Sequence, residues 1–211
     1  MITKKITRSR IKAFVSKHAV RGHTLDLGCA DSVYADLFPD RVGFDVKPGK
    51  RVDVVGDAHK LPFADETFDC ILCTEVLEHL HTPHQAISEM NRVLKKDGLL
   101  ILTTRFLIPI HDAPGDYFRY TKYGLRHLFK NWSIVELTEE ATVIETFAIL
   151  LQRLGYQSKL RGGKLTKFLV FLLAKIVAGS SWLLIEGYGD ITRSSREDNF
   201  MTSGYYLAAR K

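Results

Sequence analysis

The stretch Thr24-Leu25-Asp26-Leu27-Gly28-Cys29-Ala30-Asp31-Ser32 is where the residue types of this sequence first suggest chemistry. A short apolar run leads into a glycine and a row of small residues, which lets backbone N–H groups approach a ligand closely. Such a turn lies at the carboxyl end of a parallel strand, where open α/β sheets bind cofactors. The spacing Gly-x-Ala-x-Ser lacks the later glycines of the dinucleotide fingerprint, so a turn with a purely structural role is the alternative.

A second set of residues could move protons. His111 and Asp112 are neighbours in a loop that also holds Tyr117, and a histidine beside a carboxylate is suited to act as a general base. If the reaction deprotonates a hydroxyl group, we expect the catalytic residues to be His111, Asp112 and Tyr117. The alternative is that Asp116 and Arg119 only hold this loop in place through hydrogen bonds.

The three cysteines predict neither a disulfide framework nor a metal centre. Cys70 and Cys73 form a Cys-x-x-Cys pair inside an apolar run that reads as a buried strand, and residues three apart on a strand point to opposite faces. We therefore expect free thiols, no metal site and a reducing compartment. The basic start is not followed by a continuous apolar core, so we expect no signal peptide and a cytoplasmic protein.

Short apolar runs alternate with helical patterns along the chain. The predicted strands cover residues 24–27, 41–45, 52–55, 68–73, 99–104, 132–137 and 204–209. A helix is predicted directly after the first turn, and a second one near 82–95, which ends at Gly98. A third is predicted after Thr121, which can serve as its N-cap. This alternation predicts an α/β fold with a doubly wound, seven-stranded, mostly parallel sheet and helices on both faces.

Two basic segments lie outside this alternation within what we treat as one domain, 1–211. Residues 1–23 predict a basic amphipathic helix, with seven Lys or Arg and no acid. Residues 139–198 predict a basic, apolar helical insertion between the sixth and seventh strands, longer than a connection needs. Within it, residues 146–185 carry six basic side chains and no acid, so the remaining 17 basic residues stand against all 24 acidic ones.

This charge asymmetry favours a negatively charged partner. Because the basic residues alternate with aliphatic ones and no recognition motif is present, we do not expect nucleic acid binding. Residues 168–185 are strongly apolar, but Lys175 and Gly179-Ser180-Ser181 argue against a membrane-spanning helix. Three interpretations remain open for this segment: a buried helical lid, a dimer surface, or a segment lying on an anionic membrane surface.

The motifs together resemble class I S-adenosylmethionine-dependent methyltransferases. Residues 25–29 resemble the first motif of that family, and Asp45 resembles the acidic residue that ends its second strand. Other matching stretches follow in the family's order: Gly56-Asp57-Ala58, Leu61-Pro62-Phe63, Phe68-Asp69, Glu75-Val76-Leu77-Glu78-His79-Leu80 and Leu94-Lys95-Lys96-Asp97-Gly98-Leu99-Leu100. The resemblance covers residues 20–130 and is strongest to small bacterial members with unassigned substrates.

The resemblance implies S-adenosylmethionine as cofactor and S-adenosylhomocysteine as product. The cofactor-binding residues that it implies are Asp26, Gly28, Cys29, Ala30, Asp45, Asp57, Ala58, Thr74 and Glu75. Asp45 would accept hydrogen bonds from both ribose hydroxyls, a use that suits a carboxylate. The Gly28–Ala30 backbone would face the amino-acid part, and Glu75 would flank the reactive methyl group.

The expected function is methyl transfer by direct displacement to a small or lipid-linked acceptor. The alternative is a non-catalytic binding or scaffold protein on the same fold, because Ala30 and Ser32 replace glycines of the family pattern. A nicotinamide dehydrogenase is disfavoured by the missing glycines. The sequence predicts neither the acceptor nor the oligomeric state.

Overall fold

The computed structural model describes residues 6–211, and contacts among its Cα atoms divide the chain into two compact units. One unit holds 11–105, 111–138 and 205–211, and the other holds 106–110, 139–204 and the first described residues. The first contains almost all of the predicted sheet. Each unit is described by itself.

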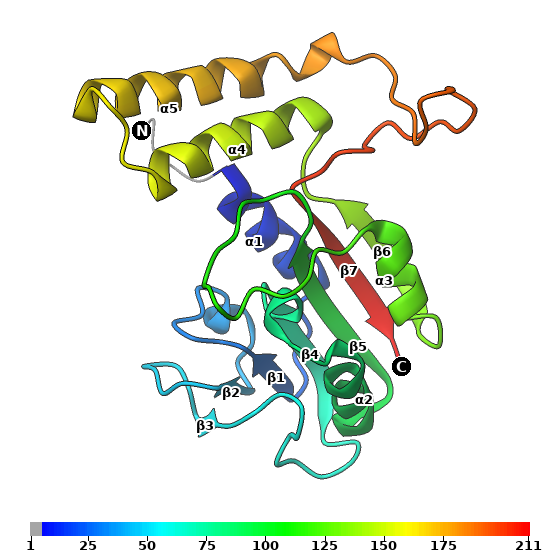
Figure 1. Ribbon diagram of the computed structural model, residues 1–211. Coiled ribbons are helices and arrows are strands. Elements are labelled where there is room, and N and C mark those ends of the chain that lie inside the picture. Colours follow the sequence, from blue (N-terminus) through cyan, green and yellow to red (C-terminus); the bar gives the residue numbers. More distant parts are fainter. Residues whose placement is uncertain (1–5) are drawn as a thin grey trace. The chain divides into compact units, whose positions relative to one another are not determined.

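The sheet has seven strands, as predicted (Figure 1). They are β1 (Thr24–Leu27), β2 (Arg41–Asp45), β3 (Val54–Val55), β4 (Phe68–Thr74), β5 (Leu94–Arg105), β6 (Ser133–Glu139) and β7 (Gly204–Arg210). Their order across the sheet is β3-β2-β1-β4-β5-β7-β6, and the four pairs from β3 to β5 are parallel. Parallel strands bring their carboxyl ends to one edge, so residues 27, 45, 55 and 74 end strands on the same side of the molecule.

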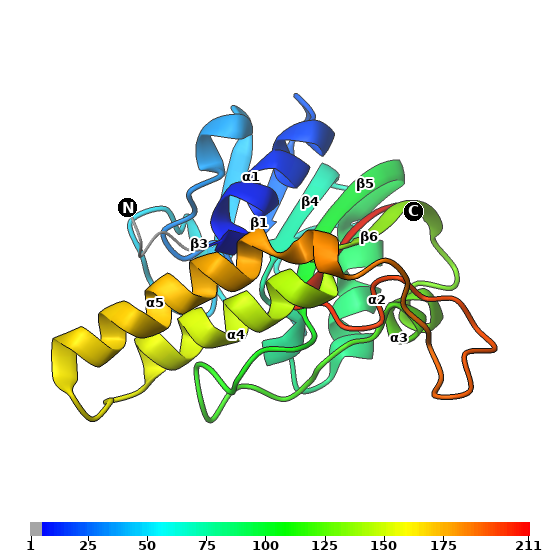
Figure 2. The same cartoon turned by 90° about the horizontal axis from the view of Figure 1, so that it is seen from above.

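Helices cover both faces of this sheet (Figure 2). On one face, α1 (Ile6–His18) inserts Ile11, Phe14 and Val15 against the alternate residues Cys70 and Leu72 of β4. The alternation places the neighbouring residues of β4 on the opposite face, which α2 (Pro83–Val93) and α3 (Lys122–Leu128) occupy. The predicted helix over 1–23 is therefore confirmed from residue 6; residues 1–5 lie outside the described part.

The helix predicted directly after the first turn is wrong. In its place the chain forms one 3₁₀ turn, Ala35–Leu37, and Phe38 is already extended at φ −126° and ψ 90°. Pro39 follows, and the residue before a proline is pushed out of the helical region. The apolar residues from Val33 to Phe38 thus occupy a loop, and no helix begins at the turn after β1.

The prediction that Gly98 closes a helix is also wrong. Helix α2 ends at Val93, and β5 begins at once with Leu94. The pairing shifts register, since Phe68 faces Leu94 and Cys70 faces Leu99. Asp97 in the extra segment has a positive φ of 60°, so Gly98 belongs to an irregularity of β5.

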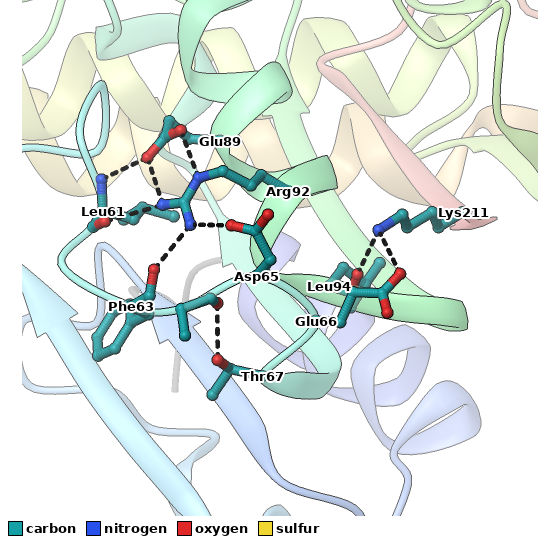
Figure 3. A network of polar contacts seen from close by, with 10 residues as sticks. Leu61, Phe63, Asp65, Glu66, Thr67, Glu89, Arg92, Leu94 and Lys211 are labelled. Carbon is teal, nitrogen blue, oxygen red and sulfur yellow. Dashed lines mark hydrogen bonds and ion pairs between the residues drawn. The ribbon is translucent and has the colours of Figure 1, made fainter.

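The loop that precedes β4 is held by one arginine of α2 (Figure 3). Arg92 donates to the carbonyl oxygens of Leu61 at 3.0 Å and Phe63 at 2.8 Å, and pairs with Asp65 and Glu89. Glu89 in turn accepts a hydrogen bond from the Leu61 amide at 2.8 Å. This network fixes the loop that lies between β3 and β4.

The predicted insertion forms a pair of helices in the second unit, α4 (Val143–Gln157) and α5 (Gly163–Gly179), followed by the 3₁₀ turn Ser181–Leu183. A capping box between Thr142 and Glu145 starts α4. Helix α5 packs on α4 through Phe171, which lies against Gly155. Phe171 and Ala174 are the buried residues of α5, which argues against a buried lid. Among the described residues, no helix is long and apolar enough to cross a membrane.

Candidate functional site

A pocket of about 290 Å³ lies at the carboxyl edge of the sheet, entirely within the first unit. It is lined by Leu27, Gly28, Phe44, Asp45, Val46, Gly56, Asp57, Ala58, His59, Val76, His79, Leu80 and His81. These residues come from the ends of β1, β2, β3 and β4 and from the segments that follow them. The volume is near the lower end of the range of small-molecule sites.

The turn after β1 requires a glycine at its first position. Gly28 has a φ of +70°, and a Cβ there would lie 2.2 Å from a methyl carbon of Val76. The backbone N–H groups of Gly28 and Cys29 donate to the Phe44 carbonyl at 2.8 and 3.1 Å, and the Ala30 N–H donates to Asp45 at 2.9 Å. The amides that we expected to meet a ligand are thus engaged within the protein, and Ala30 keeps a strained φ of 41° without a glycine.

Asp45 ends β2 and lines the pocket, as the sequence implied. Its Oδ2 accepts from the Ala30 N–H and its Oδ1 from the Lys47 N–H at 3.0 Å. These bonds fix the carboxylate, and each oxygen keeps a further lone pair for a ligand hydroxyl. The side chain is thereby preorganised to accept two hydrogen bonds.

Asp57 and Ala58 also line the pocket, on the segment after β3. Asp57 Oδ1 accepts from the backbone N–H of His59 at 2.9 Å and contacts its ring Nδ1 at 2.6 Å. The hydrogen bond from the His59 backbone is the main cause that holds the pKa of Asp57 below its usual value. The carboxylate is therefore charged at neutral pH and faces the pocket as an acceptor.

Asp26 lies away from the pocket lining, although the resemblance implied a role in binding. The side chain is 1% exposed and accepts a hydrogen bond from Arg41 Nε at 2.9 Å. Burial is the main cause that raises the pKa of Asp26, against the opposing effect of Arg41. Cys29 also turns inward, with its Sγ 3.4 Å from the Arg51 carbonyl, and burial raises its pKa to about 11.

Thr74 is the last residue of β4 and Glu75 follows it, and neither is among the residues that line the pocket. Glu75 has a positive φ of 59°, accepts from the Thr103 hydroxyl at 2.9 Å and forms an ion pair with Arg105. The following residue, Val76, does line the pocket. The strained turn at Glu75 thus directs Val76 toward the ligand space, while Glu75 pairs with β5.

The three residues that we expected to act as catalytic base, His111, Asp112 and Tyr117, have different neighbours in the structure. His111 lies beside Asp116, with Nδ1 3.5 Å from its carboxylate, and against His79 with ring centroids 4.9 Å apart. Asp112 has a positive φ of 53°, and its carbonyl oxygen accepts a hydrogen bond from the Gly115 N–H. Tyr117 is 53% exposed, and its ring lies 6.2 Å from that of His81.

The carboxylate beside His111 is Asp116, which sequence reasoning treated as a structural residue. Asp116 accepts the His111 backbone N–H at 3.0 Å and pairs with Arg119 at 2.5 Å. The Arg119 guanidinium holds the pKa of Asp116 well below its usual range. The expected structural role of Asp116 and Arg119 is therefore observed.

Several pocket residues were not predicted to bind a ligand. They are Leu27, Phe44, Val46, Gly56, His59, Val76 and Leu80. Most of them are next in sequence to a residue that the resemblance implied for cofactor binding, as Val46 is to Asp45. Their position beside a strand end is therefore the sequence feature that could have predicted them. The apolar side chains among them gave no separate sign of function.

Comparison with known sequences finds a match for the part of the chain that holds the pocket. Residues 23–102, which contain all strands from β1 to β4 and most of β5, match the methyltransferase domain family. This part of the chain is similar to methyltransferase domains. The resemblance stated from the sequence is thus confirmed for these residues of the domain.

Curated sequences support this likeness to methyltransferases. Demethylmenaquinone methyltransferase of Renibacterium salmoninarum is 38% identical over 112 residues, which are 48% of this chain and 46% of that protein. The chain spans about half the length of the curated relatives it matches.

Solved structures show that the fold extends beyond the matched residues. A putative methyltransferase of Bacillus halodurans superposes with a TM-score of 0.58 over 95% of this chain and 98% of that one, at 20% identity. A Burkholderia thailandensis 1,6-didemethyltoxoflavin N1-methyltransferase, solved with S-adenosylhomocysteine, gives 0.56 over 99% and 80%, at 13% identity. At such identities the likeness concerns the fold alone, and it confirms the predicted α/β fold.

Proposed function

We propose that this protein binds S-adenosylmethionine in the pocket at the carboxyl edge and transfers its methyl group to a small or lipid-linked acceptor. The observation that carries the proposal is the lining of the pocket. It combines the carboxylates of Asp45 and Asp57 with apolar walls, and no lysine or arginine lines it among residues 6–211. That combination suits a ligand with hydroxyl donors and a flat base but no phosphate.

The turn after β1 supports the same ligand over a dinucleotide. A pyrophosphate is bound by free amides at a helix N-terminus. Here the amides of Gly28, Cys29 and Ala30 are engaged, and no helix follows the turn. The residues present therefore fit S-adenosylmethionine better than a nicotinamide cofactor, and Ala30 is compatible with it because the Ala30 amide serves Asp45.

Each residue has a task in this proposal. When bound, S-adenosylmethionine supplies a methyl group that an acceptor takes by direct displacement. Asp45 holds the ribose hydroxyls and Asp57 the adenine edge, while Phe44, Val46 and Leu80 enclose the base and exclude water. Alignment of the reacting groups then provides most of the acceleration.

Calorimetry with S-adenosylmethionine and S-adenosylhomocysteine tests the proposal. Asp45→Asn should weaken binding of both about tenfold or more, because it replaces charge-assisted hydrogen bonds with weaker ones. Asp36→Asn is the matched control, because Asp36 is exposed and pairs with Arg51 outside the pocket. Failure of the wild-type protein to bind either ligand would contradict the proposal and favour the scaffold alternative.

The second part of the proposal concerns an anionic membrane surface, which suits a lipid-linked acceptor. Helix α5 exposes an apolar face formed by Leu165, Phe168, Leu169, Leu172, Leu173 and Ile176, of which Leu165 is 68% and Ile176 62% exposed. The spacing of three and four residues keeps these side chains on one side of the helix. Lys164, Lys167 and Lys175 are also exposed on α5, and 146–185 carry no acid. An apolar face with basic margins is the pattern of a helix that lies on anionic lipid.

Flotation with vesicles tests the membrane part separately. We expect the protein to float with vesicles containing anionic lipid at low salt, and to lose binding as salt screens the charges. A Leu169→Ser, Ile176→Ser variant should stay unbound, whereas Val135→Ser on β6, equally apolar and 54% exposed, should bind as wild type. Self-association through α5 without vesicle binding would contradict the proposal.

A further inference from the structure

Three potential metal ligands meet beside the pocket, and the proposed function does not use them as a set. One carboxylate oxygen of Glu78 and one ring nitrogen each of His79 and His111 lie within 4.8 Å of one another. The two imidazole rings are inclined at 75° to each other. We propose that Glu78, His79 and His111 bind a divalent cation.

Glu78 supplies an observation that is independent of this clustering. Its side chain is fully buried, and Oε2 accepts from the Thr104 hydroxyl at 2.7 Å. Oε1 has no hydrogen-bond partner among the residues that the structure describes. A buried carboxylate oxygen without a partner is strongly destabilising. A bound cation would satisfy this oxygen.

Two arginines act on Glu78, and both also pair with other carboxylates. Arg105 and Arg119 are the positive groups that act on Glu78. Arg105 pairs with Glu75 and Arg119 pairs with Asp116, so each guanidinium has a carboxylate partner of its own.

The two histidines are positioned as metal ligands usually are. His79 Nδ1 lies 2.6 Å from the Gly115 carbonyl and must donate to it, which leaves the lone pair on Nε2. His111 Nδ1 faces the Asp116 carboxylate at 3.5 Å. A carbonyl or carboxylate behind each ligating imidazole fixes its orientation in metal sites.

Two imidazoles and one carboxylate indicate the kind of ion. This set favours a first-row ion such as Zn²⁺, Co²⁺ or Mn²⁺ over Mg²⁺ or Ca²⁺, which prefer oxygen ligands. Bonds of about 2.1 Å place two ligand atoms of one ion at most about 4.2 Å apart. The three side chains therefore need only small rotations, and three protein ligands leave positions open.

The open coordination positions of the cation would lie close to the pocket. His79 also lines the cofactor pocket, so the cation would lie at the edge of that pocket. Resting on the proposed function, we infer that the open positions select an acceptor with a coordinating oxygen, such as a hydroxyl group. The cation site itself does not depend on methyl transfer.

Titration of the chelator-treated chain with Zn²⁺, and with Co²⁺ followed by visible absorption, tests the site. We expect one ion per chain, with at least tenfold weaker binding in His111→Ala and Glu78→Gln. His84→Ala, which removes a histidine of α2 outside the cluster, should bind as wild type. Because Glu78 is buried, the folding of each variant is checked by circular dichroism, and His111→Ala on the loop carries the test if Glu78→Gln unfolds.

The outcomes separate this inference from the proposed function. Stoichiometric binding that is lost in His111→Ala supports the site. Absence of binding by the wild-type chain, or binding unchanged in His111→Ala, overturns it. S-adenosylhomocysteine binding measured on the same samples reports on the proposed function alone, so failure of one does not imply failure of the other.

Discussion

At the scale of residues, strand ends predicted the pocket better than the glycine pattern did. Asp45, Asp57, Ala58 and Gly28 all line the pocket, and each follows or ends a parallel strand. Asp26 sits inside β1 and pairs with Arg41. A motif identifies which segment approaches a ligand, but the alternation of side chains along a strand decides which residue faces it.

The neighbours of His111 could not be predicted in the same way. Sequence adjacency favoured Asp112 as the partner of His111, whereas the structure gives that place to Asp116. His79 comes from the segment after β4 and meets His111 through the tertiary fold. Such contacts depend on how loops fold back over the sheet edge, for which local sequence offers no periodicity.

Gly28→Ala tests the turn after β1. An alanine would hold a φ of +70° and place its Cβ 2.2 Å from Val76. We expect a loss of about 1–2 kcal/mol from the left-handed conformation alone, with further loss from the contact, measured by urea unfolding. Gly124→Ala in α3, where a Cβ would lie 3.5 Å from the Thr121 hydroxyl, should leave stability nearly unchanged. Equal stability of Gly28→Ala and wild type would show that the turn tolerates a side chain.

At the scale of elements, the sheet was the most predictable part. The ranges of β1 and β2 agree with the predictions residue for residue. The wrong helix at 33–38 shows the limit of periodicity, because Pro39 stops the helix before it completes two turns. The start of β5 was missed because Leu94–Gly98 continues the apolar spacing of α2, and only pairing with Phe68 makes it a strand.

Helix α4 permits a prediction on pH. Glu145 closes the capping box with Thr142 and also pairs with Arg10, which is the main cause that lowers the pKa of Glu145. A pKa that is lower in the folded state stabilises the protein at any pH above the pKa of the unfolded state, which is about 4.3 for glutamate. This stability is lost as the pH falls through the pKa of the folded state. Glutamine keeps the cap but removes the charge. Glu145→Gln should therefore be about 1 kcal/mol less stable than wild type near pH 6, and nearly equal to it at strongly acidic pH.

Urea unfolding of both proteins across this pH range measures the difference. Lys17→Gln is a suitable control, because the Lys17 side chain is 61% exposed and its pair with Glu136 should contribute little. A difference between Glu145→Gln and wild type that stays constant down to acidic pH would assign the effect to packing rather than to charge.

At the scale of the whole molecule, the two units carry different parts of the proposal. The unit with the sheet contains every residue of the pocket and of the Glu78 cluster. The other unit contains α4 and α5 and the exposed apolar face. The methyltransferase family match covers residues 23–102, which include every residue that lines the pocket. The acceptor depends on the later segments, for which the sequence left alternatives open.

Hydrogen exchange of the whole chain, with and without S-adenosylhomocysteine, tests the central claim most directly. The account predicts that the ligand slows exchange in residues 28–30, 45–47 and 56–59, the segments that line or support the pocket. Exchange in α5 (Gly163–Gly179) should stay unchanged without lipid. Unchanged exchange in all three pocket segments at saturating ligand, or slowing confined to other segments, would contradict a cofactor site at this edge of the sheet.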